Sequence, residues 1–256
     1  MANYLLKKSY QLKNLKEIKF KDLLGDHGVF TTMWIFGRPQ KILFFENHIS
    51  NLIKSTKFYS IKKKSIRSDI LKLINQNLNS KKKYNHLLRI ALSKNIISIS
   101  LRKRIKPVSN FNLKLVNLKR QEPEFKNLKY NKILKYLSKL DSSKSDIGLC
   151  SNKKIYESGT CNIFFVKDNK FYSPINKFYK GITYKFFKSK IKKIINKDIL
   201  ISSLHLFDEI ILIGSGKGVT SVKSINQIHW KRKSLKSFNR LLKHYKIAIS
   251  KCPKYI

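Results

Sequence analysis

Tyr156-Glu-Ser-Gly-Thr-Cys-Asn162 precedes the apolar run Ile163-Phe-Phe-Val166, the polar turn Lys167-Asp-Asn-Lys170 and the segment Phe171-Tyr-Ser-Pro174. Apolar β-forming residues on both sides of a short polar turn predict a β-hairpin. Gly181-Ile-Thr183 then opens a segment with apolar residues at helical spacing, which predicts a helix over 182–196. Because the first turn of a helix has unpaired N–H groups and a positive dipole end, it favours anions. A carboxylate before the strand and an anion site after the hairpin are the parts that a charged cofactor needs.

The composition is that of a globular chain with an extreme positive charge. The 256 residues suffice for one large domain or two small ones, and a hydrophobic content of 42% excludes a disordered chain. Lys+Arg of 56 against Asp+Glu of 14 gives a formal charge of +42. Since the lysines are spread over every segment, we interpret the charge as a compositional bias. We therefore expect no nucleic-acid partner, although anionic small molecules would be attracted.

Cysteine usage and apolar runs bear on the compartment. Cys150, Cys161 and Cys252 have neither metal-type spacing nor the pattern of a disulfide framework. Residues 1–7 lack the apolar core of a signal peptide, and no apolar run approaches the length of a membrane span. These features predict a cytoplasmic protein that does not bind a membrane and has no metal site.

Further patterns extend the framework on both sides of the opening stretch. A glycine-rich loop at 25–28 leads into a strand that contains Thr31-Thr32, and Lys41-Ile-Leu-Phe-Phe45 is predicted to be its hairpin partner. Amphipathic helices are predicted over 46–55, 62–79 and 233–250. The run 208–213 is predicted to be a strand, and it leads into a glycine-rich loop, Gly214-Ser-Gly-Lys-Gly218.

Taken in order, these motifs resemble the class IV aminotransferases, pyridoxal phosphate enzymes that include branched-chain and D-amino acid aminotransferases and aminodeoxychorismate lyase. The resemblance covers nearly the whole chain. It implies an α/β fold of two domains, each a mixed sheet with helices, with the cofactor in the interdomain cleft. We expect a smaller N-terminal domain at 1–105, a connection at 106–122 and a larger cofactor-binding domain at 123–256. The resemblance alone implies a homodimer.

The resemblance also implies roles for individual residues. Lys129, just before a predicted helix, corresponds to the lysine that binds the cofactor covalently, and Lys126 and Lys132 are the neighbours with which it could be confused. Glu157 corresponds to the carboxylate that holds the protonated pyridine nitrogen, so that the ring can accept electrons. The residues that correspond to the phosphate site are Ile182, Thr183, Ser215, Gly216 and Asn51, the last at a position where relatives have an arginine.

Several functions remain open within this resemblance. Thr31 and Thr32 resemble the catalytic stretch of aminodeoxychorismate lyase more than that of branched-chain aminotransferase. The first hypothesis is therefore a lyase that releases pyruvate to give 4-aminobenzoate for folate synthesis. The alternative is a branched-chain or D-amino acid aminotransferase. A hypothesis of another class is a degenerate, non-catalytic binding protein, because Trp34, Asn51 and Tyr184 stand where many relatives have arginine.

Overall fold

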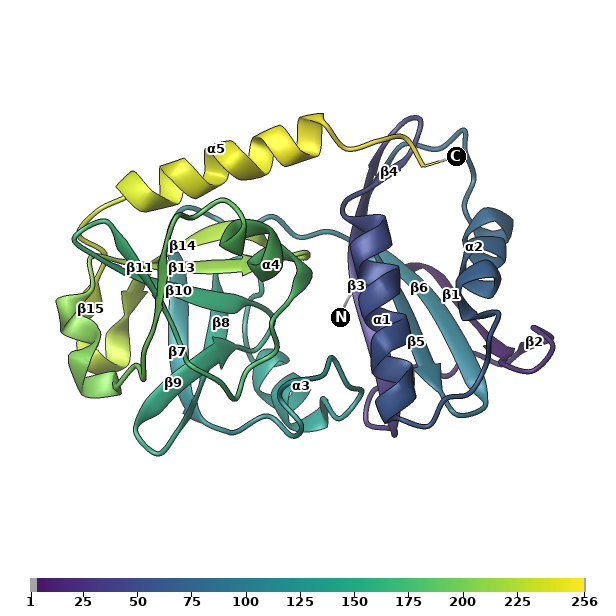
Figure 1. Cartoon of the computed structure of the whole chain (residues 1–256), viewed down its shortest axis with the longest axis horizontal. Helices are drawn as coiled ribbons and strands as arrows, with labels where there is room; N and C mark the ends of the chain where they lie inside the picture. Colours follow the sequence, from purple (N-terminus) through teal and green to yellow (C-terminus); the bar gives the residue numbers. More distant parts are fainter. Residues whose placement is uncertain (1–3, 256) are drawn as a thin grey trace. The chain divides into compact units, whose positions relative to one another are not determined.

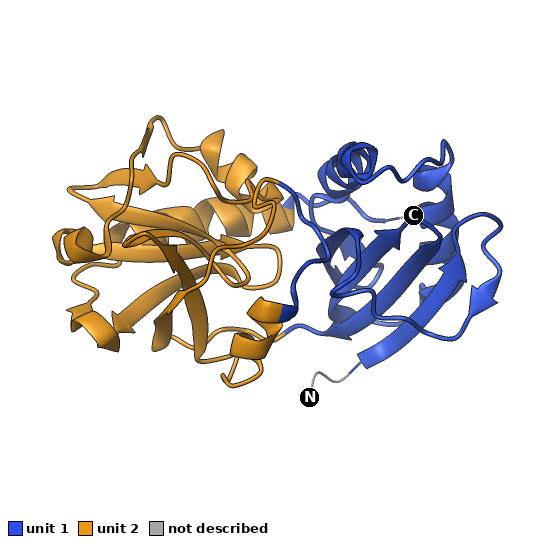
Figure 2. Ribbon diagram, turned by 90° about the horizontal axis from the view of Figure 1, so that it is seen from below, with its two compact units in different colours: residues 1–104, 125–131, 251–256 blue, residues 105–124, 132–250 orange. Residues whose placement is uncertain are grey.

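The computed structural model describes residues 4–255, which form two compact units (Figure 2). Unit 1 contains residues 4–104, 125–131 and 251–255, and unit 2 contains residues 105–124 and 132–250. The segment 125–131 thus has its contacts in unit 1. The domain limits expected from the sequence, 1–105, 106–122 and 123–256, stay a prediction.

Unit 1 is built on a six-stranded sheet with the strand order β2-β1-β6-β5-β3-β4 (Figure 1). Its strands are β1 (Tyr4–Gln11), β2 (Glu17–Ile18), β3 (Gly28–Gly37), β4 (Lys41–Ile42), β5 (Tyr84–Ser93) and β6 (Ile96–Lys103). All pairings among the described residues of this sheet are antiparallel, whereas a mixed sheet was expected. A two-residue connection joins β5 to β6, and only antiparallel strands can be joined so tightly.

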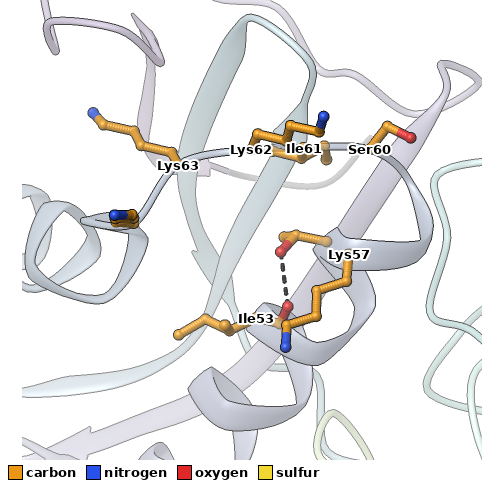
Figure 3. A pocket seen from close by; sticks show the side chains of 8 residues that line it. Ile53, Lys57, Ser60, Ile61, Lys62 and Lys63 are labelled. Atoms are coloured by element: carbon orange, nitrogen blue, oxygen red, sulfur yellow. Dashed lines mark hydrogen bonds between the residues drawn. The ribbon is translucent and has the colours of Figure 1, made fainter.

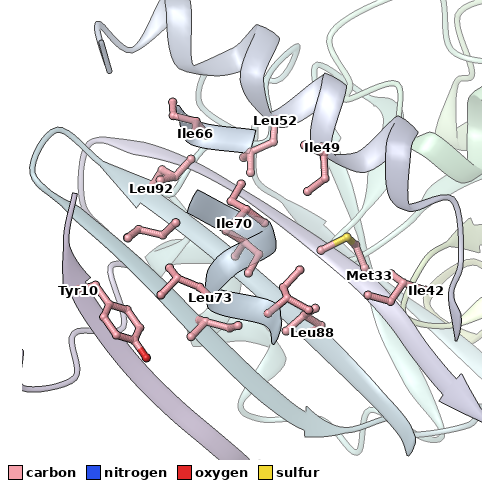
Figure 4. Packing of buried hydrophobic residues seen from close by; sticks show 14 of the residues in the cluster. Tyr10, Met33, Ile42, Ile49, Leu52, Ile66, Ile70, Leu73, Leu88 and Leu92 are labelled. Atoms are coloured by element: carbon pink, nitrogen blue, oxygen red, sulfur yellow. The ribbon is translucent and has the colours of Figure 1, made fainter. Parts of the chain in front are cut away.

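Two helices, α1 (Phe45–Phe58) and α2 (Ile66–Asn77), pack their apolar faces into the core of unit 1. Ile49 of α1 and Ile70 of α2 are fully buried in one cluster with Met33 and Leu88 of the sheet (Figure 4). Burial of each such side chain contributes about 1.5–3 kcal/mol. The predicted strand over 41–45 is wrong beyond Ile42, because Phe44 adopts a left-handed conformation (φ 57°) and α1 begins at the next residue.

Unit 2 contains the mixed sheet, with the order β12-β11-β10-β13-β14-β7-β8-β9 and with β15 paired to β14. Its strands are β7 (Phe111–Asn117), β8 (Ser145–Ser151), β9 (Lys154–Ser158), β10 (Asn162–Lys167), β11 (Lys170–Ser173), β12 (Ile194–Asn196), β13 (Glu209–Gly214), β14 (Gly218–Ile225) and β15 (Trp230–Lys231). β7 is parallel to both β8 and β14, and β11 is parallel to β12; the other pairings are antiparallel. The predicted α/β class is confirmed.

The predicted hairpin is present as β10 and β11. Asp168 and Asn169 form its turn with positive φ angles of 51° and 59°, which suit the twist of an antiparallel pair. The predicted helix over 182–196 is wrong in its second half, since α4 spans only Ile182–Lys188. Ile194 and its neighbours instead form β12 beside Phe171 of β11, so their apolar spacing serves a strand.

The remaining helices of unit 2 are α3 (Asn131–Leu137), which starts at the last residue of a unit 1 segment, α5 (Lys236–Ser250) and the 3-10 helices η1 (Ile201–Leu206) and η2 (Asn226–Ile228). The buried carboxylate of Glu209 accepts the N–H groups of Ser237 and Phe238 at 2.7 and 2.8 Å. This contact satisfies donors in the first turn of α5 and fixes the start of that helix. Among residues 4–255, no helix is both long and apolar enough to cross a membrane.

Candidate functional site

Glu157 lies at the end of β9, and its carboxylate is buried. Arg120 Nη1 lies 3.4 Å from Oε1 and 3.3 Å from Oε2 of Glu157, and the N–H of Tyr179 donates to Oε2 at 3.4 Å. The side chains of Arg120 and Glu157 are both almost completely buried. Charged side chains are rarely buried to this extent unless they form an ion pair. The sequence did not indicate a role for Arg120, because nothing in it marks one basic residue as buried among so many.

Asn162, the first residue of β10, ties the loop before α4 to the sheet. Its Nδ2 donates to the carbonyl of Tyr179, and its Oδ1 accepts the N–H of Gly181 at 3.1 Å. A Cβ at Gly181 would lie 2.9 Å from Asn162 Oδ1, so a larger residue would displace the amide oxygen that accepts this hydrogen bond. The N–H of Tyr179 also donates to Glu157. The Asn162 side chain therefore helps to fix both the surroundings of the Glu157 carboxylate and the start of α4.

Thr183 lies in the first turn of α4 and is almost completely buried. The N–H of Lys185 makes a helical hydrogen bond to Gly181, so the N–H groups of Ile182 and Thr183 precede the helical ladder. Within the described part of the chain, Thr183 Oγ1 has no hydrogen-bond partner. A buried hydroxyl without a partner destabilises a protein by about 1–3 kcal/mol, and an anion would satisfy it.

Ser215 and Gly216 lie in the loop between β13 and β14, next to a buried polar network. The fully buried Asp146 accepts hydrogen bonds from Ser158 Oγ at 3.1 Å and from Thr160 Oγ1 at 2.5 Å. Lys217 Nζ lies 4.0 Å from the same carboxylate. Asp146 therefore connects the residues that follow Glu157 with the loop that carries Ser215.

In unit 1, Thr31 forms a buried pair with a histidine of α1. Thr31 Oγ1 lies 2.7 Å from His48 Nδ1. Burial, together with the charge of Lys126, lowers the pKa of His48 to about 3, so the imidazole is neutral at pH 7. Asn51 lies one helical turn after His48. Thr32 follows Thr31 on β3, and because side chains alternate along a strand, it lies on the opposite face of the sheet.

The three candidate lysines have different surroundings. Lys126 lies in an extension of the sheet beside β3, where the N–H of Phe30 donates to its carbonyl at 2.9 Å. Its Nζ lies 4.9 Å from the centre of the Phe30 ring. Lys129 lies two residues before the start of α3, and Lys132 is exposed on α3. The structure thus brings Lys126 next to Phe30, which precedes Thr31 on β3, and the assignment of Lys129 stays a prediction.

A separate pocket of about 610 Å³ lies at the end of α1 in unit 1 (Figure 3). Its lining residues are Ile53, Thr56, Lys57, Ser60, Ile61, Lys62, Lys63 and Lys64. Lys63 is already engaged by Asp69 at 2.7 Å. Lysines occur over the whole chain, so their presence here indicates no particular ligand. Residues 4–255 contain no cluster of three or more His, Cys, Asp or Glu side chains suited to a metal ion.

Comparison with known proteins identifies similar chains. Residues 28–225 match the family model for amino-transferase class IV. Among solved structures, the branched-chain aminotransferase of Thermoproteus uzoniensis with norvaline has a TM-score of 0.77 at 16% identity and covers 95% of both chains. A candidate 4-amino-4-deoxychorismate lyase of Legionella pneumophila has a TM-score of 0.73 at 17% identity, covering 86% of this chain and 91% of that one.

A third similar structure is the branched-chain amino acid aminotransferase of Thermobaculum terrenum in its PLP form. It has a TM-score of 0.73 at 13% identity and covers 95% of this chain and 94% of its own. No curated protein matches the chain significantly. At these identities the structural likeness concerns the fold.

Proposed function

The chain belongs to the amino-transferase class IV family, whose members are pyridoxal phosphate enzymes, and from this premise we propose that it is an aminodeoxychorismate lyase. The reaction would release pyruvate and give 4-aminobenzoate for folate synthesis. The choice of lyase rests on Thr31-Thr32, and it agrees with the fold similarity to the Legionella chain. A branched-chain or D-amino acid aminotransferase is the alternative, supported by the fold similarity to the Thermoproteus chain.

The observation that carries the cofactor assignment is the set of polar groups in unit 2. Glu157 offers a buried carboxylate, which suits a protonated pyridine nitrogen. Thr183 offers a buried hydroxyl that lacks a partner among the described residues, beside the N–H groups that start α4, and these donors suit a phosphate. We assign Ile182, Ser215 and Gly216 to the same phosphate site. When bound, pyridoxal phosphate supplies an electron sink for bond breaking at the substrate.

The amine that the cofactor chemistry requires is proposed to come from the segment 125–131. The family resemblance favours Lys129, while contacts favour Lys126, which lies against Phe30 and close to His48. We propose that this lysine moves the proton at the substrate carbon. His48 remains neutral at pH 7 and holds the Thr31 hydroxyl in place, so that Thr31 has a fixed orientation. From the family resemblance we also propose that Thr32 takes part in catalysis and that Asn51 contributes to cofactor binding.

The lyase proposal predicts pyruvate release from aminodeoxychorismate without any keto acid. Purified protein loaded with pyridoxal phosphate should produce pyruvate and 4-aminobenzoate in equal amounts, detected by a coupled assay and by fluorescence. The matched control is Lys132→Ala, which removes an exposed lysine and should leave the rate unchanged. Amino transfer from leucine to oxoglutarate without pyruvate release would contradict the lyase proposal and favour the alternative.

A non-catalytic family member is the remaining alternative, supported by Trp34, Asn51 and Tyr184 at positions where many relatives have arginine. Absence of any spectral change on addition of pyridoxal phosphate would favour it. We further propose a homodimer, as the family resemblance implies, and a cytoplasmic location, which the cysteine usage favours. Light scattering of the purified protein measures its mass and checks this assembly.

A further inference from the structure

We propose that Arg120 is a positioning residue that keeps Glu157 ionised, so that the carboxylate is ready to hold the ring nitrogen of the cofactor. The ion pair is a property of the folded chain itself. Its use in holding the cofactor rests on the proposed function. Arg120 is not among the residues that the family resemblance indicated.

The local structure holds Arg120 against Glu157 from a neighbouring segment. β7, β8 and β9 are consecutive in the sheet, with Leu149 of β8 opposite Glu157 of β9. Arg120 follows the end of β7, and the N–H of Leu118 donates to the carbonyl of Cys150 on β8 at 2.9 Å. The guanidinium thus approaches both oxygens of Glu157, at 3.3 and 3.4 Å, with exposed fractions of 4% and 5% for the two side chains.

The charges around Glu157 explain why the arginine matters. A carboxyl group buried without a counter-charge prefers its neutral form, and a protonated acid lacks the negative charge that a pyridinium needs. Arginine is charged at any relevant pH. Tyr179, which also lies beside the pair, is neutral, because burial raises the pKa of its phenol to about 12. On the neighbouring strand β8, Asp146 lies 4.0 Å from Lys217.

Linkage gives the sign of the expected pH effect. In Arg120→Met, the buried Glu157 would have a pKa above its unfolded value of about 4.3. Between these two pKa values the folded state holds a proton that the unfolded state lacks, so stability falls as the pH rises. Each unit of pKa difference changes the unfolding constant by about tenfold. With Arg120 present, Glu157 is ionised when folded and this loss is absent.

Urea unfolding of the apo-protein tests the ion pair at two pH values. About pH 5.5 lies between the expected unfolded and folded pKa values of Glu157 in Arg120→Met, and about pH 8 lies above both. We expect the unfolding constant of Arg120→Met to increase, relative to wild type, by at least about tenfold more at the higher pH. Arg120→Lys, which keeps the charge, and the double variant Arg120→Met/Glu157→Gln should show no such difference between the two pH values. An equal loss at both pH values for Arg120→Met would overturn the proposal.

The outcome can still be interpreted if Arg120→Met does not fold under every condition. If Arg120→Met is unfolded at the higher pH but recovers at the lower pH or in the double variant, the ion pair is supported. If it stays unfolded at both and the double variant does not recover, an ordinary packing role replaces the proposal.

A titration with pyridoxal phosphate, followed by absorbance, tests the link to the cofactor. Wild type and Arg120→Lys should bind pyridoxal phosphate. Arg120→Met should bind it about tenfold more weakly, because the raised pKa of Glu157 leaves less of its carboxyl group ionised to hold the ring nitrogen. Equal affinity of Arg120→Met and wild type would overturn the positioning role. If wild type does not bind pyridoxal phosphate, the proposed function fails, whereas the urea comparison still decides whether Arg120 keeps Glu157 ionised.

Discussion

Borohydride reduction of the protein loaded with pyridoxal phosphate is expected to attach the cofactor to Lys126. Its Nζ packs against the Phe30 ring, 4.9 Å from the ring centre, and its backbone is fixed by pairing with β3. An amine held against an aromatic face and close to a neutral His48 is positioned more rigidly than the exposed amine of Lys132 on α3. Lys126→Ala should therefore lower turnover by about a hundredfold or more, the range for loss of a catalytic proton carrier.

Peptide mass spectrometry of the reduced protein locates the label, and three outcomes are distinct. A label on Lys129 would contradict the expectation and restore the assignment by family resemblance. A label on any lysine outside 125–131 would contradict both assignments. The unfolding free energies of Lys126→Ala and Lys129→Ala should each stay within about 1 kcal/mol of wild type, because neither substitution opens a cavity in the core. Loss of turnover can then be attributed to chemistry.

The sequence predicted the elements whose pattern is local. The hairpin at 163–173 was predicted from two apolar runs and a polar turn, and both turn residues have the left-handed backbone that such a turn requires. The helix over 62–79 was predicted from its apolar spacing, and α2 (Ile66–Asn77) forms the central part of that range. Periodicity was sufficient here because a single apolar face decided the structure.

The sequence did not predict features that depend on partners remote in the chain. Ile194 and Ile195 fit a helical spacing, but pairing with β11 makes them a strand. Arg120 and Glu157 are 37 positions apart, and only the fold brings them together. The choice between Lys126 and Lys129 stays a prediction, and composition cannot make it in a chain with 56 basic residues.

Thr183→Val is expected to stabilise the apo-protein and to weaken binding of pyridoxal phosphate. In the apo-protein the substitution removes a buried hydroxyl that has no partner among the described residues, which should raise the unfolding free energy by about 1 kcal/mol or more. A hydrogen bond to a charged group contributes about 1.5–3 kcal/mol. Its loss should therefore weaken cofactor binding by about tenfold to a hundredfold. Urea unfolding and a cofactor titration measure the two effects.

Thr56→Val is the matched control for this prediction. Thr56 is also buried and helical, but its Oγ1 donates to the carbonyl of Ile53 at 2.7 Å. Loss of a satisfied hydrogen bond should lower the unfolding free energy by about 1 kcal/mol and leave cofactor affinity unchanged. Opposite signs for the two threonines in the unfolding experiment would identify Thr183 as a group that is held ready for a ligand. Destabilisation by Thr183→Val, with unchanged affinity, would mean that its hydroxyl supports the fold and does not bind phosphate.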